Sequence, residues 1–207
     1  MAVETTIVAV IGAGQMGSGI AQVLAQAEQQ VLLTDISYDL AKKGRDNVAA
    51  DLERALRRGK MTESERDAVL GRITAVAGVE AASSADWVIE AATERMDVKR
   101  AILSSADGVC PPHTILASNT SSLSITEMAS ATGRPDKVIG LHFMNPVPVM
   151  QLVEIVLGLA TSEDTLNAAR GLVARLGKTP VVVKDSPGFV SNRVLMPMIN
   201  EAICALM

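Results

Sequence analysis

Short apolar runs and longer amphipathic segments alternate along the chain from Thr5 to Val190. Apolar runs rich in Val and Ile predict buried strands, and segments with apolar residues at helical spacing predict the helices between them. The expected strands are Thr5–Ile11, Gln30–Asp35, Ile73–Val76, Asp86–Ala91, Thr114–Ser118, Lys137–His142, Gln151–Val156 and Pro180–Val183. The expected helices are Gln15–Ala27, Tyr38–Arg58, Glu63–Leu70, Glu94–Asp107, Thr126–Ala131 and Glu163–Leu176. This alternation predicts an α/β protein with a Rossmann-like, doubly wound, mostly parallel sheet.

The segment from Ser186 to Met207 has apolar residues at helical spacing over much of its circumference. Pro197 is expected to kink or interrupt this helix, and no Gly, Asn or cationic cap marks its end. A helix so apolar needs a cover, either a partner chain or a continuation of this one, and the missing stop signal favours a continuation. We therefore expect residues 1–185 to form the sheet domain and residues 186–207 to begin a truncated helical domain.

The composition of the chain limits the kinds of molecule that it can be expected to bind. The 207 residues are 48% hydrophobic, which is enough for one large domain with a real core. A net charge of −4 and an aromatic content of 2% argue against nucleic acid, whose binders need a basic surface and stacking side chains. The sequence has neither a signal peptide nor a membrane-length apolar run, which indicates a cytoplasmic protein, or one that is mature after import, with no membrane partner. Cys110 and Cys204 lie far apart with no His cluster nearby, so neither a disulfide nor a metal site is expected.

A glycine motif follows the first expected strand and opens the first expected helix. It reads Gly12, Ala13, Gly14, Gln15, Met16 and Gly17. In the Gly-x-Gly-x-x-Gly fingerprint the glycines allow a tight turn, close approach of the backbone to a pyrophosphate, and close packing of helix on strand. The second strand ends in Asp35, about 20 residues further on, where the fingerprint places its ribose ligand. Asp35 would accept hydrogen bonds from a 2′-hydroxyl and repel a 2′-phosphate, so NAD is the expected cofactor; capping of the next helix is the alternative role.

Two histidines are available as the base that an alcohol oxidation by NAD requires. His113 lies in a polar turn, where a solvated side chain is expected. His142 closes an apolar strand at its carboxyl end, the edge at which open α/β sheets bind their ligands. Position alone fits a core histidine bonded to the backbone equally well. His142 is therefore the candidate base, with that alternative open.

Three blocks of sequence are more specific than the glycine motif. They span residues 118–123, 141–154 and 185–193 and read SNTSSL, LHFMNPVPVMQLVE and DSPGFVSNR. Together they resemble the L-3-hydroxyacyl-CoA dehydrogenase family, most closely its bacterial 3-hydroxybutyryl-CoA type, over essentially the whole chain. The resemblance implies reversible NAD-dependent oxidation of an (S)-3-hydroxyacyl-CoA to the 3-ketoacyl-CoA. It also implies that the full-length protein is a homodimer, with a helical C-terminal domain that completes the active-site cleft.

The resemblance assigns roles to single residues. It implies that His142 is the general base in oxidation and the general acid in reduction, with Glu154 on its other ring nitrogen. A carboxylate there would fix the tautomer and favour the imidazolium, whereas without that partner Glu154 would be an outward-facing edge residue. Ser121 and Asn192 are implied to hydrogen-bond the 3-oxygen of the substrate and hold it against the histidine. The surroundings of Ser121 also suit an ordinary polar loop.

Further contacts with NAD are implied for Glu94, Lys99, Asn145 and Ser121. From the sequence alone, Glu94 is an exposed acid at a helix start and Lys99 is a surface base. The second expected helix carries cations in a region that lies near CoA in the family, but a solvated helix face explains them equally well. These cations are Lys42, Lys43, Arg45, Arg54, Arg57, Arg58 and Lys60.

Two other functions stay open. One keeps the fold and the His–Glu pair but oxidises a sugar acid or a carnitine-like hydroxy acid. In the other, the chain is a fragment that binds NAD with little catalysis, because the helical domain that closes the cleft lies outside it.

Overall fold

The computed structural model describes residues 6–207, so the expectation that the first strand begins at Thr5 lies outside the described residues. An eight-stranded sheet forms the centre, in the order β3-β2-β1-β4-β5-β6-β7-β8. The strands are β1 (Ile7–Ile11), β2 (Gln30–Asp35), β3 (Ile73–Ala77), β4 (Trp87–Glu90), β5 (Ile115–Ser118), β6 (Val138–Phe143), β7 (Leu152–Leu157) and β8 (Thr179–Lys184). All neighbouring pairs are parallel except β6 and β7. The predicted doubly wound, mostly parallel sheet is confirmed.

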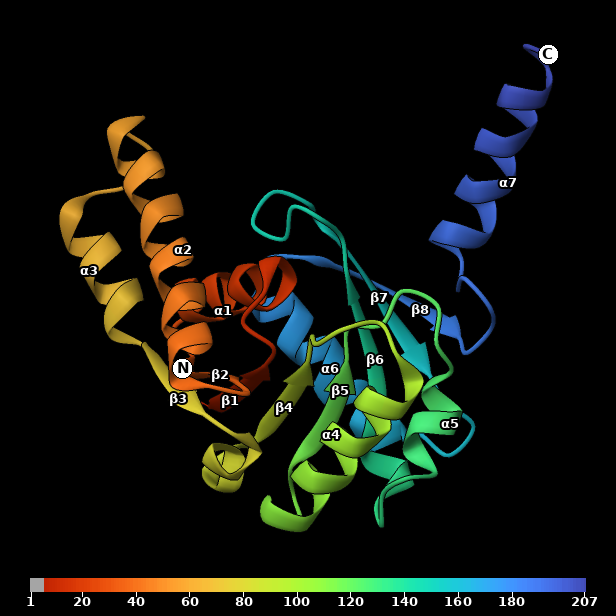
Figure 1. Ribbon diagram of the computed structural model, residues 1–207, viewed down its shortest axis with the longest axis horizontal. Coiled ribbons are helices and arrows are strands. Elements are labelled where there is room, and N and C mark those ends of the chain that lie inside the picture. Colours follow the sequence, from red (N-terminus) through yellow and green to blue (C-terminus); the bar gives the residue numbers. More distant parts are fainter. Residues whose placement is uncertain (1–5) are drawn as a thin grey trace.

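Helices cover both faces of this sheet (Figure 1). They are α1 (Gln15–Gln26), α2 (Tyr38–Arg57), α3 (Glu63–Gly71), α4 (Met96–Val109), α5 (Ile125–Ala129), α6 (Glu163–Arg175) and α7 (Ser191–Cys204), with 3-10 helices η1 (Val79–Ser84) and η2 (Pro135–Lys137). Helices α1, α2, α3 and α6 pack on one face, and η1, α4 and α5 pack on the other. In β1, Val8 and Val10 belong to the first of these two cores, while Ala9 and Ile11 belong to the second. Strands covered on both faces need apolar residues at every position, which explains the continuous runs in the sequence.

The connection between β6 and β7 differs from the others. The two strands are antiparallel, and His142 pairs directly with Glu154 in their register. Residues facing each other in an antiparallel pair point to the same side of the sheet, with about 4.5–5.5 Å between their Cβ atoms. A short loop, residues 144–151, joins the strands because no crossover helix is needed. The reversal of direction therefore places these two side chains together.

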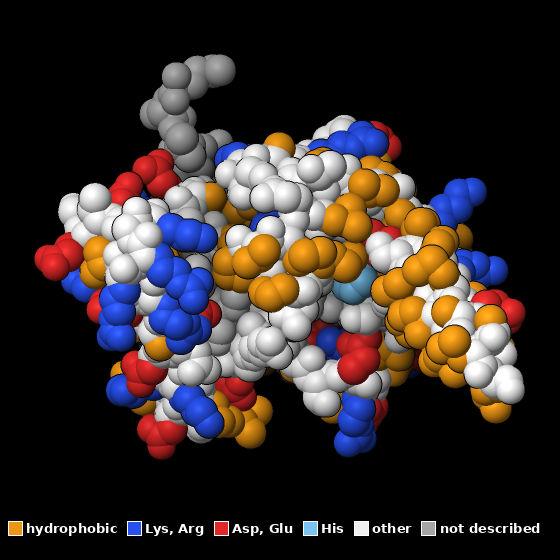
Figure 2. All heavy atoms as spheres, turned by 90° about the horizontal axis from the view of Figure 1, so that it is seen from above, with side chains coloured by type: hydrophobic (Ala, Val, Ile, Leu, Met, Phe, Trp, Pro, Cys, Tyr) orange, Lys and Arg blue, Asp and Glu red, His pale blue; other side chains and the backbone are white. Residues whose placement is uncertain are grey.

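Helix α7 leads away from the sheet, and none of its residues is buried (Figure 1). Figure 2 shows hydrophobic side chains along this helix, among them Val194, Met198 and Ile203. Pro197 lies inside α7 but does not interrupt it, so of the expected kink or interruption the interruption is wrong. A proline removes a single backbone donor, and no packed neighbour crowds this helix. Among residues 6–207, no helix combines the length and the apolarity needed to cross a bilayer.

Candidate active site

The glycine turn lies at the carboxyl end of β1, between β2 and β4. Gly12 has φ +102°, and a Cβ there would lie 2.7 Å from the carbonyl carbon of Ala91. A Cβ on Gly17 would lie 1.7 Å from the carbonyl oxygen of Gly12, so the helix can approach the strand only without a side chain. A Cβ on Gly14 would meet nothing within 4 Å. The space beside Gly14 at the start of α1 is therefore open, as the approach of a pyrophosphate to this helix N-terminus requires.

Asp35 lies beside this turn, at the end of β2. Its carboxylate accepts hydrogen bonds from the backbone N–H of Ala13 and of Ile36, both at 2.8 Å. The N-cap of α2 is Ser37, whose side chain accepts a hydrogen bond from the N–H of Leu40, so the capping role considered for Asp35 is wrong. A largely apolar cavity of about 110 Å³ adjoins Asp35. The arrangement suits a nucleoside whose ribose meets the carboxylate.

His142 and Glu154 form a buried pair on β6 and β7. The Nδ1 atom of His142 lies 2.8 Å from the Oε2 atom of Glu154, and the residues are 5% and 1% exposed. The other ring nitrogen, Nε2, has no hydrogen-bond partner within residues 6–207. The ring of Phe189 packs edge-on against the imidazole, with 5.7 Å between the ring centroids. The imidazole is thus held on one side and free on the other, as a proton-transfer group should be.

The carboxylate of Glu154 also accepts hydrogen bonds from the start of α7. Its Oε1 atom accepts hydrogen bonds from the backbone N–H of Ser191 at 2.8 Å and of Val190 at 3.2 Å. Burial raises the pKa of Glu154, but the hydrogen bonds from His142 and Ser191 outweigh it, so the pKa lies below its ordinary value. Glu154 is therefore a carboxylate at neutral pH and is not an edge residue facing solvent.

Ser121 and Asn192 meet at the rim of the same site. The Nδ2 atom of Asn192, in the first turn of α7, donates to the carbonyl oxygen of Ser121 at 3.2 Å. The N–H of Ser121 donates to Oε1 of Glu94 at 2.8 Å, and the Thr120 hydroxyl donates to the same oxygen at 2.6 Å. The hydroxyl of Ser121 bonds nothing within the described part of the chain. It is available to a ligand.

Lys99 is 1% exposed, so the sequence-based interpretation of a surface base is wrong. Its ammonium lies 2.8 Å from Oε1 of Glu90 and 3.3 Å from Oε2 of Glu94. Glu94 itself lies in the loop before α4, because the helix begins at Met96 rather than at Glu94. Burial raises the pKa of Glu94, but hydrogen bonds from Thr120 and Ser121 and the charge of Lys99 lower it further than burial raises it.

Glu90 is the charged residue that the sequence analysis overlooked. It is fully buried at the end of β4, and it accepts hydrogen bonds from Lys99, from the Ser118 hydroxyl and from the N–H of Ala92. A carboxylate that ends an apolar strand needs such partners, and this requirement was the available signal. The pair of Glu90 and Lys99 connects the sheet to Glu94 and, through Glu94, to Ser121.

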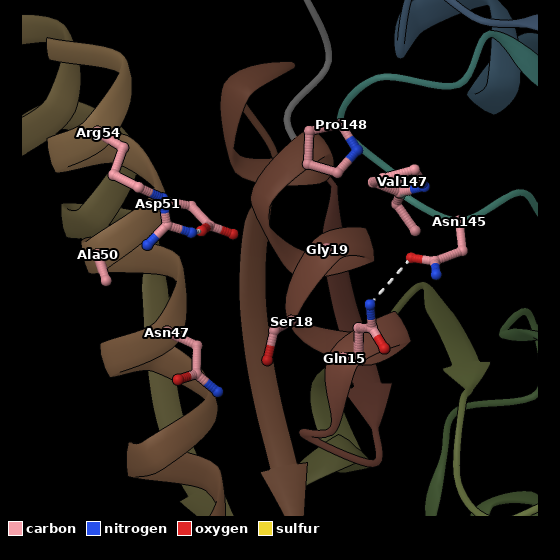
Figure 3. Close-up of a pocket in the computed structure, with 11 residues that line it drawn as sticks. Gln15, Ser18, Gly19, Asn47, Ala50, Asp51, Arg54, Asn145, Val147 and Pro148 are labelled. Carbon is pink, nitrogen blue, oxygen red and sulfur yellow. Dashed lines mark hydrogen bonds and ion pairs between the residues drawn. The ribbon is translucent and has the colours of Figure 1, made fainter.

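A cavity of about 340 Å³ lies between α1, α2 and the loop after β6 (Figure 3). Asn145 forms one wall, and its Oδ1 atom accepts a hydrogen bond from Nε2 of Gln15 at 3.2 Å. Arg54 lies on the opposite wall, on α2, where it pairs with Asp51. Of the seven cations considered for this region, Arg54 lines the cavity, whereas Arg45 bonds the backbone oxygens of Ile73 and Leu70.

The predicted site residues lie at the carboxyl ends of the parallel strands, mostly in two groups; Glu94 and Lys99 join the first group through Ser121, and Asn145 bonds Gln15 at the start of α1. His142, Glu154, Ser121 and Asn192 are linked through β6, β7 and the start of α7, and the glycine turn lies with Asp35 at the ends of β1 and β2. His113 is largely exposed and pairs with Asp86. Within residues 6–207, no group of three or more His, Cys, Asp or Glu side chains is placed to hold a metal ion.

Known proteins resemble this chain in sequence and in fold. Residues 7–186 match the family model described as 3-hydroxyacyl-CoA dehydrogenase, NAD binding domain. The chain is 54% identical to a probable 3-hydroxybutyryl-CoA dehydrogenase of Bacillus subtilis, over 97% of the chain and 70% of that protein. It is 45% identical to the 3-hydroxyadipyl-CoA dehydrogenase of Escherichia coli, over all of the chain and 43% of that protein. The crystal structure of (S)-3-hydroxybutyryl-CoA dehydrogenase from Ralstonia eutropha superimposes with a TM-score of 0.95 at 48% identity, over 98% of this chain and 72% of that one.

Proposed function

Because the chain belongs to the 3-hydroxyacyl-CoA dehydrogenase family, we propose that it catalyses the reversible oxidation of (S)-3-hydroxybutyryl-CoA to acetoacetyl-CoA. The predictions of the family, of an NAD-dependent dehydrogenase and of NAD as its cofactor are confirmed. The observation that carries the proposed mechanism is the buried pair of His142 and Glu154, whose free Nε2 atom lies at the ligand-binding edge of the sheet.

The pair can move the substrate proton. With Nδ1 protonated toward Glu154, the Nε2 atom of His142 is the acceptor, and in oxidation it takes the proton of the 3-hydroxyl. The imidazolium that forms is stabilised by the carboxylate of Glu154 at 2.8 Å. In reduction the same nitrogen returns the proton to the 3-oxygen. The Ser121 hydroxyl and the Asn192 amide hold that oxygen in place by donating hydrogen bonds to it.

The glycine turn and Asp35 fit NAD. The open space beside Gly14 and the amides at the start of α1 suit its pyrophosphate, and Asp35 suits the hydroxyls of its adenosine ribose. Bound NAD⁺ supplies the acceptor for the hydride that leaves C3 of the substrate. Glu94, Asn145 and Ser121 hold the nicotinamide half, while the buried Lys99 acts on it by holding Glu94.

The cavity of about 340 Å³ suits part of the acyl-CoA, because it joins the Asn145 loop to a cationic helix. Figure 2 shows Lys and Arg side chains gathered on the side of the molecule that holds α2 and α3. We assign Arg54 as a contact with a phosphate of CoA, although Asp51 competes for its guanidinium.

Residues 1–185 serve as the NAD-binding domain, and residues 186–207 begin a helical domain that closes the cleft and forms a homodimer in the full-length cytoplasmic enzyme. Support for this division comes from α7, in which no residue is buried and the large apolar side chains are exposed. Exposed apolar helix faces are stabilised by burial against a partner surface. The chain spans 70% of the length of its relative in Bacillus subtilis.

One assay tests the proposed function. Oxidation of NADH is followed in the presence of acetoacetyl-CoA, and reduction of NAD⁺ in the presence of a sugar acid or a carnitine-like hydroxy acid. We expect turnover with the acyl-CoA to exceed turnover with the acids by orders of magnitude, and the reverse ranking would contradict the proposed substrate. The same assay on a lengthened chain measures how much the helical domain contributes, and calorimetry with NADH measures cofactor binding separately.

A further inference from the structure

Lys178 is a buried lysine that has no part in the proposed chemistry. It follows α6, is 8% exposed and forms no ion pair with an acidic side chain of residues 6–207. Its ammonium donates hydrogen bonds of 2.7 Å to the backbone oxygens of Val147 and Met150. An ammonium buried without a carboxylate is costly, and burial lowers the pKa of Lys178. The hydrogen bonds to the two carbonyl oxygens offset this cost.

The two carbonyl oxygens belong to the loop that joins the His142 and Glu154 strands. Inside this loop, the N–H groups of Val149 and Met150 donate to the carbonyl oxygen of Pro146, both at 3.0 Å. Lys178 therefore bonds one carbonyl oxygen near each end of this hydrogen-bonded turn and holds the turn in shape. On the opposite side, the buried Val147 packs against α1 at Gly19, where a Cβ would lie 2.9 Å from the Val147 Cβ.

The same loop forms one wall of the cavity between α1 and α2, through Asn145, Pro146, Val147 and Pro148. Asn145 is also the loop residue proposed to contact NAD. Lys178 thus bonds backbone oxygens of the loop, while Asn145 and the residues after it line the cavity proposed for the acyl-CoA. Loss of this donor leaves the carbonyl oxygens of Val147 and Met150 without their partner, and the buried Val147 oxygen can reach water only if the loop moves.

We propose that Lys178 is a positioning residue for the cofactor and the acyl-CoA, holding the loop of residues 144–151 where Asn145 and the cavity wall can contact them. The proposal rests on the proposed function for the identity of these ligands. A lysine that only stabilises the fold would affect the amount of folded protein, whereas a positioning lysine affects how the folded protein binds.

The test compares Lys178→Met with Lys178→Arg and with Lys184→Met, which removes an exposed lysine at the end of β8, the strand that begins directly after Lys178. For Lys178→Met we expect the Kd for NADH and the KM for acetoacetyl-CoA each to rise about tenfold, an effect of roughly 1.4 kcal/mol, with kcat changed less than about twofold. Lys178→Arg can still donate to both carbonyl oxygens and should restore most of the affinity. Lys184→Met should behave as the wild type.

Hydrogen exchange keeps the proposal separate from activity. The amides of Val149 and Met150 should exchange faster in Lys178→Met, while those of β6 and β7 keep their protection. If Lys178→Met does not fold, Lys178→Gln takes its place; its amide nitrogen is uncharged and one bond nearer the backbone than the lysine Nζ, so smaller rises of Kd and KM in the same direction are expected. Unchanged Kd and KM, or a lower melting temperature with unchanged affinity, would overturn the proposal. Calorimetry with NADH gives this answer even if acetoacetyl-CoA proves not to be the substrate.

Discussion

Replacement of Glu154 by Gln is the sharpest test of the proposed proton transfer. The variant keeps the size of the side chain and an oxygen that can accept from the N–H of Ser191, but it removes the negative charge beside His142. The Gln amide can also donate to Nδ1, which would put the imidazole proton on Nε2. In that tautomer the nitrogen facing the substrate cannot accept a proton.

The structure sets the magnitude. Glu154 is 1% exposed, so solvent screens its interaction with His142 little. A hydrogen bond to a charged group contributes about 1.5–3 kcal/mol, which corresponds to a loss of roughly 10-fold to 150-fold in rate. Two unit charges about 4 Å apart at an effective dielectric constant of about 20 interact by about 4 kcal/mol, which sets an upper limit near 10³-fold. We expect kcat to fall about 10²-fold.

The assay measures kcat in both directions, with (S)-3-hydroxybutyryl-CoA and NAD⁺ and with acetoacetyl-CoA and NADH. The Kd for NADH should stay within about twofold of the wild type, because Glu154 faces the histidine and α7 rather than the glycine turn. Glu163→Gln, an exposed acid on α6, is the matched control and should retain full activity. If Glu154→Gln kept more than about half of the wild-type kcat, the assigned role of the pair would be refuted.

Three further predictions follow from the same contacts. His142→Ala should lower kcat by about 10²-fold to 10⁴-fold with NADH affinity preserved, and equal loss of both would point to misfolding instead. Gly17→Ala should destabilise the protein by about 4 kcal/mol or more, because its Cβ would lie 1.7 Å from the Gly12 carbonyl oxygen; Gly71→Ala, where a Cβ meets nothing within 4 Å, is the control in the same urea titration. Asp185 accepts hydrogen bonds from Ser124 and Thr126, and although burial raises its pKa, these bonds bring the pKa below the ordinary 3.8. Its contribution to stability is therefore present above about pH 3.8 and lost as pH falls through the folded-state pKa, so the stability deficit of Asp185→Asn at pH 7 should shrink in acid, and a constant deficit would speak against this assignment.

The local pattern of the chain predicted the elements well. The predicted β2 strand, Gln30–Asp35, has the observed bounds, and the predicted bounds of β3 to β8 differ from the observed ones by one residue at one end or at both. Such agreement is expected because a strand covered on both faces imposes apolar residues at every position. The tight turn could likewise be predicted from the glycine motif, since a Cβ at Gly12 or at Gly17 would collide with the backbone.

The charged residues mark the limit of this kind of inference. Lys99 has the sequence surroundings of a surface base, yet on helix α4 it is buried against Glu90, at the end of the preceding strand β4. Lys178 was not singled out either, because its partners are backbone oxygens about thirty residues earlier, which leave no trace in side-chain patterns. Sequence periodicity reports which face of an element is buried, but it does not report which atoms meet there.

Taken by itself, the sequence determined the order of the elements, the glycine turn, and the resemblance that pointed to His142 and Glu154. Only the tertiary structure decided that β7 runs antiparallel to β6, and this register sets the two side chains opposite each other at 2.8 Å. It also decided that backbone N–H groups at the start of α7 donate hydrogen bonds to the Glu154 carboxylate. The physical reason is that helix and strand preferences act within one segment, whereas a buried charge is stabilised by donors from several segments that only the packed fold brings together.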